Sequence, residues 1–498
     1  NHINPIKIET IIKKKKSMRK ISLIGFLLFA TVMVFGQNAT DALRYSSVNY
    51  FGTTRFMSMG GAFGAVGADF SVLSTNPAGL GLYKSSEVTF TPLIYQGQTK
   101  SSYWANKTED DRYNFAFSNM GAVLTFQFPG QLETPHWRYV QFGFGVNRLL
   151  DFHNRIMIEG FNNDNSLLTS YVEYANQYGI ERNSPEELAE RANLIFYDTA
   201  TQRYYCDMPD GGVLQRKSIS TEGSMNEVVL SAAANYADKL YVGLTFGFPY
   251  FRYYESSLYS EKDIEDRNEF FRSFTLRQQL ETTSTGFNLK AGVIVRPLDW
   301  LRLGVAYHSP MFFTDMNDVW DSYIESYFDK EVPNKTVGSP LGGFEYELTT
   351  PMKVIGSVAF QIGKIGLISA DYQFVDYRDA RLHPTGDFAD VNDVIQSSYT
   401  SQNIIRVGTE WRFGPFSVRG GYGFYSSPFD NNINDGERKS GSLGVGYRSD
   451  NFFVDLGFVQ TKSSEKYYLY DPMNGDPSPA ANTDFTGNSL LMTLGFKF

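Results

Sequence analysis

Residues Ile405–Phe413 read I-R-V-G-T-E-W-R-F, and apolar and polar side chains alternate along this stretch. Successive side chains of a β-strand point to opposite faces, so this period of two predicts a strand with one apolar face. Its charged residues, Arg406, Glu410 and Arg412, fall on the other face. A charge facing lipid near the membrane midplane costs about 2–4 kcal/mol. In a transmembrane barrel these three side chains, together with Asp371 on a neighbouring strand, would therefore face the lumen.

The same alternation recurs after residue 84 and predicts fourteen strands. They lie near residues 85–95, 113–128, 137–158, 217–235, 239–255, 270–297, 301–312, 344–362, 365–378, 400–413, 416–426, 439–449, 452–462 and 488–498. Fourteen is an even number, as single-chain bacterial outer-membrane barrels require. A soluble β-sandwich would also alternate, but its outer face would be uniformly polar. Here one face is rich in Phe, Leu, Val and Tyr and the other is small or charged, which favours an all-β, antiparallel transmembrane barrel.

The connections between the predicted strands fall into two length classes. Short ones lie at 237–238, 297–300, 363–364, 414–415 and 449–451, and long ones at 96–112, 159–216, 256–269, 313–343, 379–399, 427–438 and 463–487. Short periplasmic turns and long extracellular loops are typical of outer-membrane barrels. We therefore expect an outer-membrane protein of a Gram-negative cell, with residues 85–498 forming the barrel.

The long extracellular loop 159–216 contains a helix start signal, Ser184-Pro185-Glu186-Glu187. Serine at the N-cap, proline at the first helical position and glutamate at the third form a capping box. The helix that follows would either cover the barrel mouth and gather ligand, or be a solvated decoration.

The start of the chain predicts export. Arg19 and Lys20 precede the apolar run 21–35 within residues 18–36, which is the pattern of a signal peptide. The run is shorter than the roughly 20 residues that a transmembrane helix needs. Residues 1–17 are interpreted as upstream sequence or an extended charged region, and are left out of the fold.

Charge and chemistry exclude several functional classes. Beyond residue 36 the chain has 38 basic and 53 acidic residues, a net charge of −15. A nucleic-acid partner is not expected, because it would require a basic patch. The single cysteine, Cys206, rules out an intrachain disulfide. The histidines show no metal-ligand spacing, and no G-x-S-x-G motif is present. We predict no catalytic residue, metal or cofactor.

Residues 38–84 do not alternate; they are rich in Gly, Ala, Met and Ser. Such a segment cannot bury a core of its own, and its backbone groups could not be satisfied in lipid. The segment is therefore predicted to fill the barrel lumen as a plug.

Three motifs in this segment carry a resemblance to a known family. They are Met59-Gly60-Gly61-Ala62-Phe63, Ala65-Val66-Gly67-Ala68-Asp69 and Asn76-Pro77-Ala78-Gly79-Leu80, placed just before the first strand. The chain resembles the FadL-like outer-membrane transporters (the OmpP1/FadL/TodX group), and Gly286–Pro310 resembles a hairpin common in that family. It departs from the pattern at Asp69-Phe70, where the family often has two adjacent acids.

The resemblance implies a passive transporter of hydrophobic compounds, such as long-chain fatty acids, with plug gating and lateral release through the wall. It implies a hatch at Asn76, Pro77 and Ala78. Apolar pocket candidates are Phe51, Phe56, Met57, Met59 and Phe63, although simple plug packing explains them equally. The third strand would carry the wall gap, with Gly143 and Gly145 as its weak points, because glycine weakens strands.

Several alternatives stay open. A general porin would need an open, wet lumen, and haem uptake by the same barrel would use another hydrophobic cargo. Fatty acids, aromatic hydrocarbons and haem all suit an apolar pocket. The expected partners are outer-membrane lipid, the cargo and the barrel-assembly machinery, which would recognise the terminal Phe498. A plugged barrel of this size can work as a monomer.

Overall fold

The computed structural model describes residues 39–47, 49, 51–129, 136–207, 211–329, 332–430, 434–470, 472 and 478–498. The predicted signal peptide at 18–36 and the residues before it lie outside the described residues.

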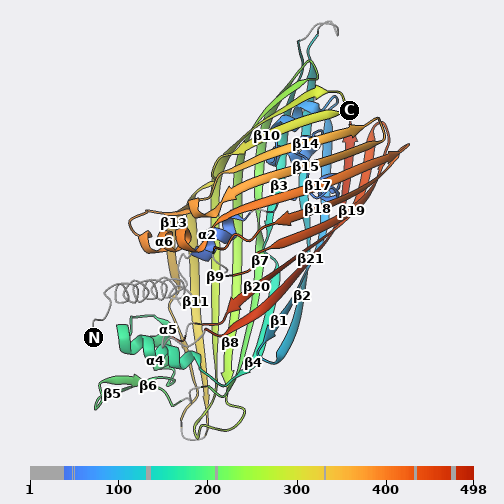
Figure 1. Ribbon diagram of the computed structural model, residues 1–498. Helices are drawn as coiled ribbons and strands as arrows, with labels where there is room; N and C mark the ends of the chain where they lie inside the picture. The colour runs from blue at the N-terminus through green and yellow to red at the C-terminus, as the bar shows by residue number, and fades with distance from the viewer. Residues whose placement is uncertain are drawn as a thin grey trace, which may run out of the picture.

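The described strands close into one antiparallel barrel (Figure 1). Consecutive strands pair along the chain, and β21 pairs with β1 from Glu87 opposite Lys497 to Ser102 opposite Asn482. The wall has fourteen strand positions among the described residues when β3 with β4, β10 with β11, and β13 with β14 are each counted as one and the short strands β12 and β16, each paired on one side only, are set aside. The prediction of a fourteen-stranded antiparallel barrel is confirmed.

The strands of the barrel sheet are β1 (Glu87–Tyr103), β2 (Asn106–Gln127), β3 (Trp137–Asp151), β4 (Asn154–Asn162), β7 (Val213–Tyr236), β8 (Leu240–Lys262), β9 (Phe271–Leu298), β10 (Leu301–His308), β11 (Phe312–Phe328), β12 (Lys335–Gly338), β13 (Gly342–Thr349), β14 (Lys353–Ile362), β15 (Gly366–Asp376), β16 (Arg381–His383), β17 (Ser401–Phe413), β18 (Phe416–Tyr425), β19 (Arg438–Arg448), β20 (Phe452–Tyr468) and β21 (Ala480–Lys497). A separate hairpin has β5 (Phe196–Asp198) and β6 (Arg203–Tyr205).

The helices are α2 (Ala39–Ser46), α3 (Thr54–Ser58), α4 (Leu167–Tyr178), α5 (Pro185–Arg191) and α6 (Ala389–Ser398), with 3-10 helices η1 (Phe70–Ser74), η2 (Pro77–Leu82) and η3 (Tyr377–Asp379). None of the helices in the described residues is long and apolar enough to cross a membrane.

The barrel exterior is apolar. On β21, Leu490, Met492 and Phe496 are exposed while the residues between them are buried or half-buried. Aromatic pairs gather at the end where the connections are short: Trp137 with Tyr236, Trp300 with Phe360, and Phe416 with Tyr447. An apolar band bordered by aromatic residues is the exterior of a transmembrane barrel. Together with the sorted connections, it places the protein in an outer membrane, as predicted.

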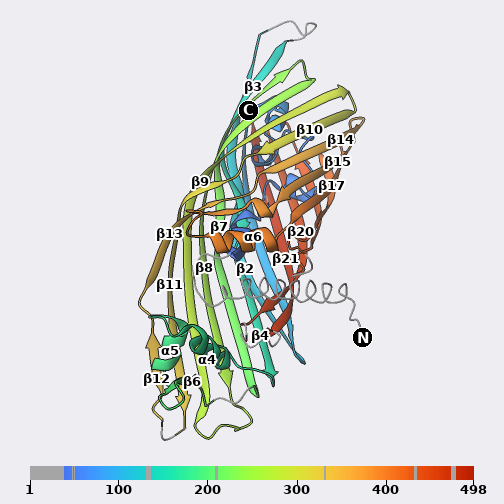
Figure 2. The ribbon, with the colours of Figure 1, turned by 60° about the vertical axis from the view of Figure 1, so that its left-hand side comes forward.

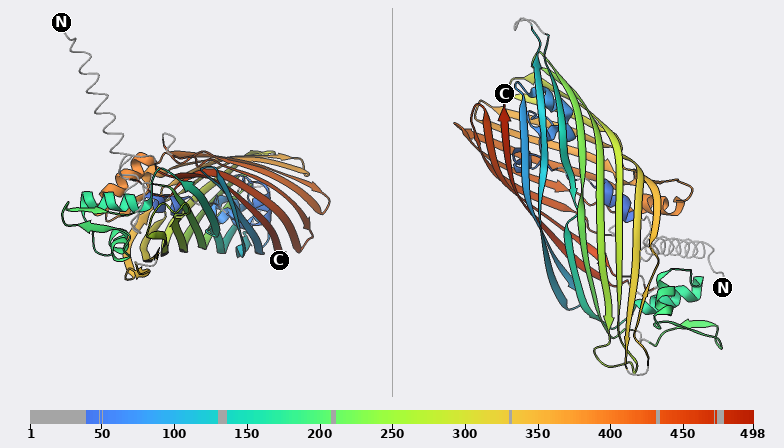
Figure 3. Two further views of the ribbon diagram at one scale, coloured as in Figure 1. Left: turned by 90° about the horizontal axis from the view of Figure 1, so that it is seen from below. Right: turned by 180° about the vertical axis from the view of Figure 1, so that it is seen from behind.

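The described residues between 39 and 84, which we call the inner segment, lie inside the barrel (Figures 1 and 3). Helices α3, η1 and η2 fill the half near the short turns, and α2 lies farther along the lumen. The turns of the segment are capped by its own side chains: Thr53 at α3, Asp69 at η1 and Asn76 at η2. These caps satisfy backbone N–H groups that the short helices leave unpaired.

At the opposite end β7, β8, β9 and β11 extend toward α4 and α5 (Figure 2). Of these, β9 has nearly the predicted bounds, whereas β7, β8 and β11 run farther than predicted. Residues 96–112 and 313–328, which we expected to be loops, form the β1–β2 hairpin and β11. Asn106–Arg112 reads N-K-T-E-D-D-R and is polar on both faces. A strand outside the membrane contacts water on both faces, so it shows no apolar alternation that a sequence pattern could detect.

The loop 159–216 holds α4, α5 and the β5–β6 hairpin. The helix predicted from the start signal is α5: Ser184 Oγ accepts a hydrogen bond from the Glu187 N–H at 3.2 Å. The Glu187 carboxylate accepts from Asn183 N–H, one residue before the N-cap, so the reciprocal half of the predicted capping box is shifted. Leu188 and Ile195 pack in an apolar cluster with α4 and the strand extensions.

Candidate functional site

The turn Asn76-Pro77-Ala78 is fully buried between the inner segment and the wall. Asn76 Oδ1 accepts from the Ala78 N–H at 3.1 Å, and Asn76 Nδ2 donates to the Gly64 carbonyl at 2.6 Å. Pro77 is at the start of η2, where its missing N–H leaves no helical bond unmade. The Asn76 side chain therefore caps the start of η2 and joins this helix to the loop at Gly64.

Glycines that face each other across neighbouring strands make room for the inner segment. Gly243 and Gly292 are directly opposite in the β8–β9 ladder, and a Cβ on either would overlap Pro77 or Asn76. The other such pairs are Gly121 with Gly145 against Phe70, Gly408 with Gly421 against Met59 and Gly60, and Gly444 with Gly457 against Ser58. Without a Cβ, another backbone can approach closely. Sequence reasoning missed these contacts, although lumen-facing glycines were visible in the alternating strands.

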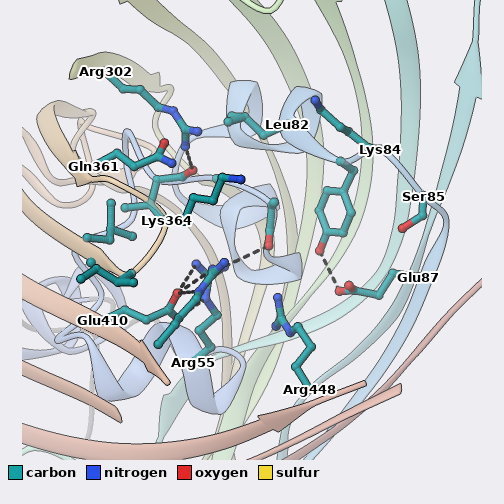
Figure 4. A pocket seen from close by; sticks show the side chains of 18 of the residues that line it. Arg55, Leu82, Lys84, Ser85, Glu87, Arg302, Gln361, Lys364, Glu410 and Arg448 are labelled. Carbon is teal, nitrogen blue, oxygen red and sulfur yellow. Dashed lines mark hydrogen bonds and ion pairs between the residues drawn. The ribbon is translucent and has the colours of Figure 1, made fainter. Parts of the chain in front are cut away.

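Buried charges also join the inner segment to the wall (Figure 4). Arg55 of α3 donates to both oxygens of Glu410 on β17, at 2.7 and 3.3 Å. Glu410 also accepts from Arg412 and from Arg419 on β18, each at 2.7 Å. Arg419 in turn donates to Asp455 on β20 at 2.6 Å. The alternating cations and anions connect α3 with three wall strands.

Asp371 on β15 binds the backbone of the inner segment. Its carboxylate accepts from the N–H groups of Phe63 and Gly64, both at 3.0 Å. Arg406, directly opposite Asp371 in the ladder, is buried and donates to Gln373 at 3.0 Å. Asp371, Arg406 and Glu410 thus lie on the lumen side of the wall.

An apolar cluster fills the lumen on the long-loop side of helices α3, η1 and η2. It includes Phe152, Met225, Phe251 and Phe313 of the wall, and we call it the chamber cluster. Tyr45 of α2 stacks on Phe251 with ring centroids 4.5 Å apart. Helix α2 therefore occupies the space that these wall side chains surround.

The five predicted pocket residues lie elsewhere. Phe56, Met59 and Phe63 are buried in the core of the inner segment, and Phe51 and Met57 pack against a small cluster on β1, β20 and β21. The apolar lumen lining comes instead from barrel strands. Its signal was present on β8: the first two lumen-facing positions beyond Tyr250, Phe251 and Tyr253, are large aromatics, where a polar or small residue is usual.

The third wall strand is interrupted at Phe152–His153, between β3 and β4. Beyond the interruption β4 pairs only with β7, and residues 106–118 of β2 have no ladder partner on that side in the described structure (Figure 3). Side chains bridge the break instead. Asn114 of β2 donates to Asp151 at 3.0 Å, and Arg148 donates to the Phe117 carbonyl of β2 at 3.1 Å.

Gly143 and Gly145, which we predicted as the weak points of the wall, lie in an unbroken part of it. Both are paired on one side with β2 and on the other with β7. A Cβ on Gly143 would lie 2.7 Å from Leu73 Cδ2, and one on Gly145 would press on Phe70. These glycines admit side chains of the inner segment. The interruption itself lies farther along the strand, around Phe152.

No family model matches the chain, and no curated protein matches its sequence. Solved structures do match. A Pseudomonas aeruginosa FadL homologue aligns with TM-score 0.53 and 12% identity, covering 90% of this chain and 100% of that one. The fold is that of this FadL homologue. The P. putida toluene transporter TodX aligns with TM-score 0.52 and 10% identity, covering 90% and 98%.

The structural similarity therefore shows a FadL-type fold, although the sequence identity is only 12% and 10%. The second of these neighbours is named as a toluene transporter. Among the described residues no three His, Cys, Asp or Glu side chains are placed to hold a metal ion.

Proposed function

We propose that the protein is a passive outer-membrane transporter of hydrophobic compounds and carries out no chemical step. The observation that supports this is the chamber cluster beside the wall interruption. Phe152 lies within the interruption and is also part of the cluster. An apolar solute held there is next to a place where the wall lacks backbone pairing. A general porin would instead need a polar, water-filled lumen.

Cargo would pass from the long-loop end into the chamber cluster and leave sideways through the interruption. Lateral release keeps an apolar molecule out of water, and transferring each CH₂ group into an apolar environment is worth about 0.8 kcal/mol. The direction of flow would follow the concentration gradient.

Helix α2 has to move for cargo to occupy the chamber cluster. Tyr45 stacks on Phe251, and Arg44 lies over the Tyr253 ring, 4.4 Å from its centroid. The Ala39 and Ser46 carbonyls accept from Tyr399 Oη at 2.8 Å and from Lys353 Nζ at 3.4 Å. The rest of the inner segment is fixed by buried ions and glycine contacts. We propose α2 as the part that yields first, with the Asn76-Pro77-Ala78 turn as the hatch behind it.

The proposed partners include the barrel-assembly machinery. Phe498 is 72% exposed, and its backbone forms two hydrogen bonds with Ser86, each 3.1 Å. The last wall strand thus presents a free aromatic side chain that a recognition factor could bind. One closed barrel contains the whole proposed route, so a monomer would suffice.

The test is uptake by cells that lack their own hydrophobic-compound channel and express this chain. Radiolabelled oleate, toluene and haemin would be compared with a small sugar. We expect faster uptake of at least one hydrophobic compound and no gain for the sugar. Fast sugar uptake without hydrophobic uptake would identify a porin.

A matched pair of variants tests the route. Phe152→Ala and Phe144→Ala each remove one phenyl ring from the third strand, but Phe144 is 49% exposed on the outer face. We expect only Phe152→Ala to change uptake, by several-fold. Equal effects in equally assembled variants would contradict exit beside Phe152.

A further inference from the structure

We propose that a cavity at the short-turn end of the barrel binds a small anion carrying a phosphate or carboxylate group. The proposal goes beyond transport, because this cavity lies on the other side of the inner segment from the chamber cluster. It has a volume of about 330 Å³ and lies between the inner segment and the wall (Figure 4).

The cavity lies at the periplasmic rim. Its wall comes from the ends of strands: Glu87 begins β1, Arg448 ends β19 and Lys497 ends β21. The tight turn at Gly363-Lys364 also lines it. Short turns face the periplasm in outer-membrane barrels, so a ligand would reach the cavity from that side.

The lining is strongly basic although the whole chain is acidic. Seven basic side chains and two acidic ones surround the cavity, a surplus of five positive charges, whereas the chain has a net charge of −9. The basic residues are Arg55, Lys84, Arg302, Lys364, Arg412, Arg448 and Lys497. Like charges around one concave space repel, and such a space concentrates ions of opposite sign.

The two acids cannot neutralise this surplus. Glu410 is already bound by Arg55, Arg412 and Arg419. Glu87 is buried, accepts from Tyr83 Oη at 3.0 Å and faces Lys497 across the β1–β21 ladder. Each carboxylate therefore has its partners within the protein.

Several of the cations, in contrast, have N–H donors that no group of the described protein uses. The side chains of Lys364, Arg448 and Lys497 make no hydrogen bond or ion pair with another described residue. Arg448 and Lys497 share the Phe453 ring, at 4.8 and 5.8 Å from its centroid. Arg302 uses one Nη to donate to the Val66 carbonyl at 2.8 Å, and its Nε is buried without a partner.

These donors suit phosphate and carboxylate oxygens. Guanidinium groups bind both anions through paired N–H donors, and lysines add positive charge without fixed geometry. Leu82, Ile365 and Leu367 add apolar surface beside the cations. The cavity can therefore hold a free phosphate or the head group and first carbons of an anionic amphiphile.

The experiment is isothermal titration calorimetry of the full mature chain in an uncharged detergent at low salt. The titrants are inorganic phosphate, hexyl phosphate and hexanol. We expect both phosphates to bind and hexanol not to bind. Tighter binding of hexyl phosphate would identify an amphiphile head group as the ligand, and equal binding a free anion; both support the site. Absence of phosphate binding, or equal binding of hexanol, would overturn it.

Variants locate the site. The double variant Arg448→Gln/Lys497→Gln should weaken phosphate binding by about tenfold or more, because it removes two charged donors. Lys364→Gln, in an exposed turn, provides a second test if the double variant assembles poorly. Lys107→Gln, an exposed lysine at the far end of β2, is the matched control and should bind as the unmodified chain does. Unchanged binding in the double variant and in Lys364→Gln would place the anion elsewhere and refute the proposal.

Discussion

At the scale of single residues, the lumen is organised by buried polar groups that each have a specific partner. Glu410 binds three arginines, Asp371 binds two backbone N–H groups, and Asn76 joins two parts of the inner segment. A buried charge is costly unless it is paired and hydrogen-bonded. These residues therefore fix one position of the inner segment rather than merely adding stability.

Glu410→Gln should loosen the inner segment. The change leaves Arg55 and Arg419 buried without their shared anion, and breaking a buried pair from one side costs about 3–5 kcal/mol. We expect faster hydrogen exchange in residues 53–69 and a lower thermal midpoint. Glu109→Gln is the control, since its ion pair with Lys100 is exposed on both sides. Unchanged exchange in Glu410→Gln would show that the glycine contacts alone hold the segment.

Two substitutions of Asn76 separate its two hydrogen bonds. Asn76→Ala removes both, at about 1 kcal/mol each, and should alter uptake of the hydrophobic compound without preventing assembly. Asn76→Asp keeps the acceptor for the Ala78 N–H but loses the donor to Gly64. If Asn76→Asp behaves as the alanine variant does, the bond to Gly64 is the important one. Normal uptake in a well-assembled Asn76→Ala would argue against the hatch.

At the scale of elements, wall strands are shaped to the inner segment. The glycine pairs lie on strands that otherwise carry large outward-facing residues, so each strand has a lipid face and a contact face. Short helices such as α3 have little stability of their own, because a nucleus of a few residues is unfavourable. Their position therefore comes from the wall around them.

Gly292→Ala should displace the Asn76 turn, because the added Cβ would overlap Asn76 Oδ1. Gly441→Ala is the matched control, since no atom lies within 4 Å of its Cβ position. We expect a several-fold change in uptake and faster hydrogen exchange near residues 76–82 only for Gly292→Ala. Identical behaviour of the two variants would mean that the wall accommodates the methyl group without moving the turn.

At the scale of the whole molecule, the barrel is closed along its β1–β21 seam but is interrupted in its third strand. Helices α3, η1 and η2 of the inner segment fill the half of the lumen near the short turns, and α2 lies within the chamber cluster. The proposed transport needs a displaced segment, and α2 is the part of the inner segment that lies within the chamber cluster.

Removal of residues 39–46 should open the chamber cluster to ligand. The wall side chains Phe152, Phe251 and Phe313 would then be free to contact an apolar fluorescent probe. We expect stronger probe binding in the shortened chain, by about tenfold or more if α2 competes directly. Phe251→Asp in the shortened chain should remove the gain. Equal probe binding with and without α2 would show that the helix does not occupy the ligand space.

Much of this molecule could be predicted from alternation alone. The period of two identified fourteen wall strands, their lipid faces and the sorted connections, because each depends on local chemistry. Ser184 and Pro185 marked α5, and the composition of residues 38–84 indicated a plug. Strand extensions such as 106–112 were missed because both of their faces contact water and no pattern remains.

Only the tertiary structure decided how distant residues meet. Gly243 and Gly292 become a contact surface because β8 and β9 are in register. Glu410 meets Arg55 because the barrel closes around α3. The break at Phe152 replaced the predicted weak point at Gly143 and Gly145, since pairing on both sides keeps those glycines in the wall. Local periodicity determines what a strand presents to lipid and lumen, while the contents of the lumen depend on contacts hundreds of residues apart that no local pattern encodes.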